Sequence, residues 1–127
     1  MPAPRRDQRG EDRRGGEGAY HPRIMTETDF HIAVDAVLAR VETALEPHDA
    51  LEVDLEGGVL TVGCPDASRI IVNRQTPNRE IWIAARSGGF HFALRDRAWR
   101  DTRSGDELFA SLARIIASQA GEEVVFD

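Results

Sequence analysis

The chain lacks any long apolar segment and is nearly free of cysteine. No hydrophobic run among its 127 residues approaches the roughly 20 that a membrane-spanning helix requires, so we expect a soluble protein that does not bind membranes. The single cysteine, Cys64, cannot form an internal disulfide, which fits a reducing compartment. Lysine is absent and all 16 basic residues are arginine, which we attribute to codon usage.

Recognisable enzyme motifs are missing too. We find no nucleophile paired with a base, no glycine-rich phosphate loop and no metalloprotease helix. The sequence therefore argues against an enzyme.

Charge is distributed unevenly along the chain. Residues 1–24 carry six arginines and four acids, whereas residues 25–127 carry 10 arginines and 18 acids, a net charge of −8. Binding to nucleic acid depends largely on basic side chains that contact phosphates, so we expect no nucleic-acid partner. Cations and basic protein surfaces suit such an acidic unit better.

The composition changes at about residue 25. Residues 1–24 are rich in glycine, proline and charge, and we expect a disordered extension or an upstream start with Met25 as the working initiator. A secretory signal has an apolar central region, which this segment lacks. Its acidic residues argue against a mitochondrial transit peptide. Residues 25–127 are expected to form one domain.

The pattern after residue 25 predicts helix, strands and helix. Apolar residues from Phe30 to Leu45 recur at helical spacing, with Thr26 or Thr28 as cap and Pro47 as the end. Strands are expected at 51–55, 58–62, 69–74, 80–85 and 90–94, with a shorter one near Trp99. A second helix is expected to start at the capping box Ser104-Gly-Asp-Glu107 and to stop at Gly121.

Short turns between successive strands require an antiparallel meander. Each helix has one apolar stripe, so both must pack on the same face of the sheet. The expected fold class is α+β: a two-layer α/β sandwich with two helices on one face of a five- to six-stranded antiparallel sheet. The other face of the sheet is left open to water.

Six carboxylates cluster between the first helix and the first strand. We call this set the acidic ridge: Glu42, Glu46, Asp49, Glu52, Asp54 and Glu56. Oxygen ligands without a histidine–cysteine set favour hard cations, including Ca²⁺, Mg²⁺, Mn²⁺ and Fe²⁺, over zinc. The spacing forms no closed cage, so a site here would be open and weak. For each carboxylate alone, a solvated surface position is the simpler interpretation, and the same holds for His31 and His48 nearby.

The open face of the sheet carries the second candidate site. Alternation places Ile70, Val72, Ile81 and Ile83 on the core side and Asn73, Gln75 and Trp82 on the opposite side, where His91 should also emerge. An exposed indole beside amides on a rigid sheet has the composition of a protein-binding hot spot. The indole could instead simply shield backbone. Trp99 is expected to anchor the last strand to the core.

Five motifs in residues 25–127 resemble those of the frataxin family, most closely its bacterial CyaY branch. They are Gly57-Gly-Val-Leu-Thr-Val62, Ile70-Ile-Val-Asn-Arg-Gln-Thr-Pro77, Ile81-Trp-Ile-Ala84, Gly88-Gly-Phe-His-Phe92 and Ser118-Gln-Ala-Gly121. The resemblance covers about 100 residues with the elements in order, and it implies the same two-layer fold.

The resemblance also implies a function. Family members are iron-binding accessory proteins of iron–sulfur cluster assembly, and in the bacterial branch they regulate the cysteine desulfurase and its scaffold protein. The resemblance would place weakly bound iron (Fe²⁺ or Fe³⁺) on the acidic ridge and partner contacts on Asn73, Gln75, Trp82 and His91. We expect a cytoplasmic protein, and a monomer because no exposed apolar helix face is evident. The chain departs from the family at Thr43 and Ala50, where carboxylates often stand, which implies a reduced capacity for iron.

Two other functions stay open. One is a ferroxidase or iron store that acts as an iron donor, which would need paired carboxylates with a histidine on facing helices. The other is an acidic interaction module without a physiological metal, whose charge serves solubility.

Overall fold

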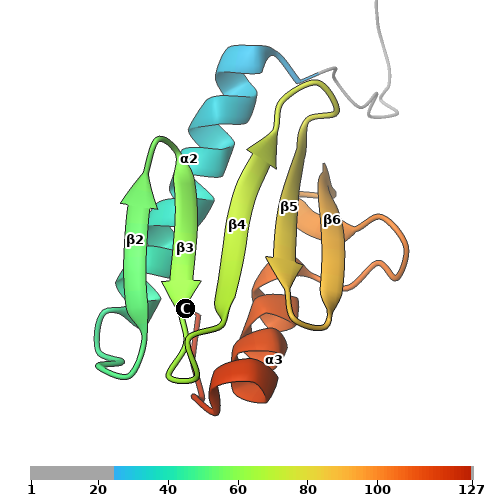
Figure 1. Cartoon of the computed structure of the whole chain (residues 1–127). Coiled ribbons are helices and arrows are strands. Elements are labelled where there is room, and N and C mark those ends of the chain that lie inside the picture. Colours follow the sequence, from blue (N-terminus) through green and yellow to red (C-terminus); the bar gives the residue numbers. More distant parts are fainter. Residues whose placement is uncertain (1–24, 127) are drawn as a thin grey trace, which may run out of the picture.

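A computed structural model describes residues 25–126 as a helix, six strands and a second helix (Figure 1). The helices are α2 (Glu27–Leu45) and α3 (Leu108–Ala120), and the strands between them are β2 (Glu52–Glu56), β3 (Val59–Gly63), β4 (Arg69–Gln75), β5 (Glu80–Ala85), β6 (Gly88–Arg95) and β7 (Ala98–Asp101). Neighbours in sequence pair antiparallel in the order β2-β3-β4-β5-β6-β7, which confirms the predicted meander. The extension predicted for residues 1–24 lies outside the described residues.

Both helices lie on the same face of this sheet (Figure 1), which confirms the predicted two-layer architecture. The core lies between the layers. Alternating strand residues supply one side of it, including Ile70, Val72, Ile81 and Ile83, all fully or almost fully buried. The helices supply the other side through Phe30, Val34, Val37, Leu38, Val41, Leu45, Leu108, Leu112, Ile115 and Ile116. The apolar residues that recur at every second position in the strands and about every 3.6 positions in the helices thus pack together in one apolar layer.

Helix α2 begins at the first of the two caps considered. The Thr26 Oγ1 accepts a hydrogen bond from the Asp29 backbone N–H at 3.0 Å, and Glu27 and Asp29 occupy the first turn. Carboxylates there interact favourably with the helix dipole. The helix ends at Leu45, two residues before Pro47, because proline cannot continue the hydrogen-bond ladder.

The predicted start of helix α3 at Ser104 is wrong. The cap is Glu107, whose carboxylate accepts from the backbone N–H groups of Phe109 at 2.9 Å and Ala110 at 3.0 Å. Ser104 closes the preceding turn instead, since its Oγ accepts from the Asp106 N–H at 3.1 Å. Asp106 and Glu107 lie antiparallel to the end of β7, through an Asp101 N–H to Asp106 C=O bond and an Arg100–Glu107 bridge. Gly121 ends the helix at φ 70°, as expected.

One polar cluster joins two turns of the sheet to helix α3. The Gln119 amide donates to Ser68 Oγ at 2.9 Å and to the Arg69 carbonyl at 3.1 Å, and it accepts from the Arg86 N–H at 3.0 Å. Asp66 accepts from the hydroxyl of Ser68 at 2.6 Å and from its N–H at 2.9 Å, and it pairs with Arg86. The hydrogen bonds from Ser68 and then the Arg86 guanidinium hold the pKa of the Asp66 carboxyl well below its usual range.

This depressed pKa predicts how stability depends on pH. The contribution of Asp66 is fully present above the unfolded-state pKa of about 3.9 and is lost as the pH falls towards the lower folded-state value. We therefore expect Asp66→Ala to be less stable than the native chain at pH 7, with the two converging between about pH 4 and pH 2. Urea denaturation at a series of pH values measures this difference. Asp96→Ala, at the exposed β6–β7 turn, should run parallel to the native chain; a parallel Asp66→Ala curve would contradict the assignment.

Candidate functional site

The acidic ridge lies at one edge of the sheet. Strand β2 is the edge strand, and helix α2 runs next to it in the layer behind (Figure 1). The ridge members on the helix and its following loop are Glu42, Glu46 and Asp49; those on the strand are Glu52, Asp54 and Glu56. All six are exposed. Fold topology therefore gathers the six carboxylates along the α2–β2 side of the domain.

The ridge is split between the two sides of strand β2. Val53 and Leu55 pair with the buried residues Val62 and Leu60, so they face the helices. The alternating residues of β2, including Asp54, consequently point to the open face of the sheet. Helix carboxylates and strand carboxylates flank the edge strand rather than converging on one point.

Ridge carboxylates have no protein partners within residues 25–126. None of the six makes a side-chain hydrogen bond or an ion pair there. Several acids elsewhere are engaged: Asp35 with Arg74 at 2.6 Å, Asp106 with Arg114 at 3.5 Å and Glu122 with His48 at 2.8 Å. Negative charge along the α2–β2 edge is therefore left uncompensated, which costs stability through like-charge repulsion and favours cations from outside.

Within the described part of the chain, no three histidine, cysteine, aspartate or glutamate side chains are close enough to hold a metal ion together. The two histidines near the ridge, His31 and His48, do not complete a metal site either, because each contacts another side chain. The His31 Nδ1 lies 2.8 Å from the Arg74 Nη1, and the His48 Nδ1 lies 2.8 Å from a Glu122 oxygen. A cation on the ridge would consequently keep most of its water ligands.

The second site is a row of three side chains across the open face. Asn73 on β4 pairs with Trp82 on β5, which pairs in turn with His91 on β6. The rings of Trp82 and His91 stack at a centroid distance of 4.1 Å and an interplanar angle of 7°. Gln75, half-buried, ends β4 opposite Glu80. The sheet thus places the four predicted contact residues on its open face, with His91 where alternation predicted it.

Trp82 is less exposed than the sequence predicted. Its indole is half-buried, since one ring face lies against His91, and its Nε1–H donates to the Glu80 carboxylate at 2.8 Å. Sequence reasoning missed Glu80, although residues two apart on a strand share a face. A partner on this surface would meet a fixed indole with a satisfied N–H, which reduces the entropy lost on binding.

Arg74 was overlooked as well. It follows Ile70 and Val72 on the core side of β4, where an arginine is uncommon. Its guanidinium reaches His31 at 2.8 Å and Asp35 at 2.6 Å on helix α2, with only 16% of the side chain exposed. Arg74 therefore fixes the first half of helix α2 to the sheet and holds His31 away from the ridge.

Comparison with known proteins agrees with this architecture. Residues 23–122 match the model of the frataxin-like domain, which spans most of the chain. The chain therefore belongs to the frataxin-like family.

Relatives within this family are similar over nearly their whole length. The chain is 48% identical to the iron–sulfur cluster assembly protein CyaY of Paraburkholderia xenovorans, over 81% of this chain and 99% of the relative. For the protein of the same name from Burkholderia mallei the identity is 47%, over 80% of this chain and 98% of the relative.

Solved structures agree in fold. The frataxin of Psychromonas ingrahamii superposes with a TM-score of 0.77 at 30% identity, covering 81% of this chain and 99% of that one. The trimeric frataxin of Saccharomyces cerevisiae complexed with ferrous iron gives a TM-score of 0.59 at 28% identity, covering 80% and 92%. Neither helix of residues 25–126 is long and apolar enough to cross a membrane.

Proposed function

We propose that the chain is a cytoplasmic accessory protein of iron–sulfur cluster assembly, which binds Fe²⁺ on the acidic ridge and regulates a cysteine desulfurase and its scaffold protein. The observation that carries the proposal is the set of six exposed carboxylates that have no partner within residues 25–126. Family membership and the names of the CyaY relatives support the pathway. The complex of the yeast relative with ferrous iron supports Fe²⁺ as the bound ion.

The chemistry of the ridge suits iron that must be released again. Carboxylate oxygens bind hard divalent ions, and each ligand lost to water lowers affinity. Since the carboxylates flank β2 without converging, one or two would contact each ion. We expect weak binding along the ridge rather than one tight centre.

The same charge would attract the desulfurase. An uncompensated row of carboxylates favours a partner pocket rich in arginine or lysine, because complementary charge speeds association and orients the partner. Bound iron would neutralise part of the row. Iron and partner binding should consequently weaken each other, a coupling that acts equally in both directions.

Geometry favours an accessory role over an enzymatic one. A ferroxidase centre places paired carboxylates and a histidine on facing helices. Here the strand half of the ridge faces away from the helices, and His31 and His48 are engaged elsewhere. Measured oxygen consumption of the chain with Fe²⁺ should therefore stay at the rate of free Fe²⁺.

Reversing two ridge charges should abolish steering to the desulfurase. We expect Glu46→Arg/Glu52→Arg to weaken capture of the desulfurase about tenfold or more at low salt, because close charge pairs across interfaces contribute about 1.5 kcal/mol or more. Pull-down at increasing salt measures this. The matched control is Glu27→Arg/Asp96→Arg, which changes net charge equally at exposed positions outside the ridge. Equal capture of both double variants and the native chain would contradict the proposal.

The same variants separate an iron-binding protein from a plain acidic module. On titration of ¹⁵N-labelled chain with Co²⁺ or Fe²⁺, amides between residues 42 and 56 should broaden selectively in the native chain and in the control. They should broaden much less in Glu46→Arg/Glu52→Arg. Uniform or absent broadening in the native chain would leave the ridge as a solubilising surface only.

A further inference from the structure

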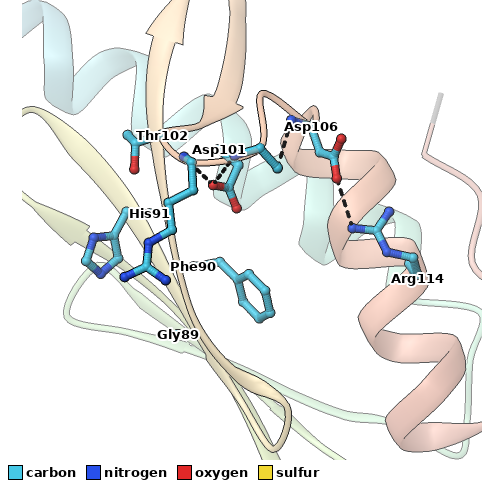
Figure 2. A pocket seen from close by; sticks show the side chains of 9 residues that line it. Gly89, Phe90, His91, Asp101, Thr102, Asp106 and Arg114 are labelled. Carbon is cyan, nitrogen blue, oxygen red and sulfur yellow. Dashed lines mark hydrogen bonds and ion pairs between the residues drawn. The ribbon is translucent and has the colours of Figure 1, made fainter.

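A pocket far from the ridge opens at the opposite edge of the sheet, where strand β7 ends (Figure 2). It has a volume of about 300 Å³ and lies between β6, the loop after β7 and helix α3. We call it the edge groove and define it by Gly89, Phe90 and His91 of β6, Arg103 and Ser104 of the loop, and Arg114 of α3. Of the residues that define it, only His91 also belongs to the predicted contact surface around Trp82.

The first half of strand β6 has no neighbouring strand on the side that faces the groove. β6 has eight residues and β7 only four, which pair with residues 92–95. The last hydrogen bond across this edge runs from the Thr102 N–H to the His91 carbonyl at 2.8 Å. Because backbone groups alternate in direction along a strand, the N–H and C=O of Gly89 face the same side as those of His91. They meet no strand there, since Gly89 pairs only with Ala84 of β5 among the described strands.

The free edge is also uncrowded. Gly88 and Gly89 carry no side chains, and a Cβ placed on either would meet no atom within 4 Å. Natural sheets usually protect such edges with proline, charge or a bulge, because an open edge pairs with other chains. Residues 88–90 carry none of these protections. Backbone of another chain can therefore approach β6 closely.

Positive charge borders the same edge. Arg103 makes no ion pair with any residue in 25–126, and Arg114 has only a long contact of 3.5 Å with Asp106. Two aspartates also line the pocket. However, Asp101 already accepts from the N–H groups of Arg103 at 2.7 Å and Ser104 at 3.1 Å, and Asp106 is the partner of Arg114. The two arginines and two aspartates of the pocket carry equal and opposite formal charge. Arg103 is nevertheless a guanidinium that has no ion-pair partner within residues 25–126, and a guanidinium prefers a carboxylate.

We infer that the edge groove binds an extended, carboxylate-bearing peptide segment of a partner protein, which adds to β6 as a short strand. Peptide backbone would pair with the free N–H and C=O of Gly89, as in other cases of strand addition. A peptide carboxylate would pair with Arg103, and an apolar side chain would pack on the half-buried Phe90 ring. The inference depends on neither iron nor the desulfurase, so it stands or falls separately from the proposed function.

Two synthetic hexapeptides test the inference on the ¹⁵N-labelled full chain. One is Thr-Val-Thr-Val-Glu-Asp with a free carboxyl end, and the other is Thr-Val-Thr-Val-Lys-Lys with an amidated end. The acidic peptide should shift the amide signals of Gly89, His91 and Arg103 and slow exchange of the Gly89 amide hydrogen, whereas the basic peptide should not. Absence of shifts at these amides up to millimolar peptide, or equal binding of both peptides, would overturn the inference.

Matched variants locate the contact. Gly89→Pro removes the edge N–H without breaking a bond to β5, and Arg103→Glu reverses the charge; each should weaken binding of the acidic peptide about tenfold. Gly89→Ala keeps the N–H in open space, and Arg95→Glu changes an exposed arginine outside the groove; both should bind like the native chain. Unchanged binding by Gly89→Pro, with its fold verified by circular dichroism, would rule out strand addition.

Discussion

Replacing Phe30 with alanine is expected to lower the free energy of unfolding by about 3–5 kcal/mol, the usual cost of truncating a buried phenylalanine. Phe30 is completely buried in the first turn of helix α2. Its ring meets Trp99 of β7 edge-on, at a centroid distance of 6.2 Å and an angle of 67°, and the Arg79 guanidinium lies 5.9 Å away. A residue near the start of the domain thus packs on its last strand.

Loss of the contact between Phe30 and Trp99 should lower the stability of the whole domain. Domains of this size have total stabilities of about 5–15 kcal/mol, so Phe30→Ala would lose a large fraction of it. Thermal and urea denaturation measure the change. Ile32→Ala is the matched control, two residues further along the same helix but 64% exposed, and it should cost less than about 1 kcal/mol. Similar losses in both variants would show that helix propensity, not burial, dominates.

The sequence was sufficient to predict the helices and strands because the pattern of apolar residues in each element reflects which of its faces is buried. Strand β5 was predicted at its observed bounds, and Ile81 and Ile83 lie in the core as alternation requires. Trp99 does anchor β7 to the core, at 6% exposure. In each case one face of an element must exclude water, and the apolar residues mark that face.

The predictions were wrong or incomplete where a side chain could find its hydrogen-bond partners in more than one local conformation. Ser104 was predicted as the cap of helix α3, but the pairing of Asp106 and Glu107 with the end of β7 delays the helix and makes Glu107 the cap. The sequence likewise could not show that Arg74 points inwards. Its guanidinium finds partners on helix α2 that are about 40 positions away along the chain, and only the assembled layers bring them together.

The contact surface around Trp82 was predictable in arrangement, because strand alternation places its residues on one face, whereas the acidic ridge was predictable in composition only. A count of carboxylates identified the acidic ridge, whereas its division across strand β2 follows from register with β3. For the edge groove, the sequence predicted a short last strand near Trp99, but the residues of β6 that this strand leaves unpaired follow only from its register.

Replacing Trp82 with alanine should have the largest effect on partner binding. We expect affinity for the desulfurase–scaffold complex to fall by about 2 kcal/mol, roughly 30-fold, which is typical of an aromatic hot spot. The physical reason is the fixed ring: Trp82 is stacked on His91 and its N–H is satisfied by Glu80, so little entropy is lost when a partner covers it. Affinity can be measured by titration calorimetry.

Two further variants divide the contribution of Trp82 between its ring and its N–H. Trp82→Phe keeps a flat ring on His91 but loses the bond to Glu80, and it should retain most of the affinity if ring contact is responsible. Glu80→Ala leaves the ring in place but frees its N–H and removes a charge at the interface. If Trp82→Ala folds normally and binds as the native chain does, the indole only shields the sheet backbone. In that case the contact surface must lie elsewhere, and the ridge alone would account for recognition of the partner.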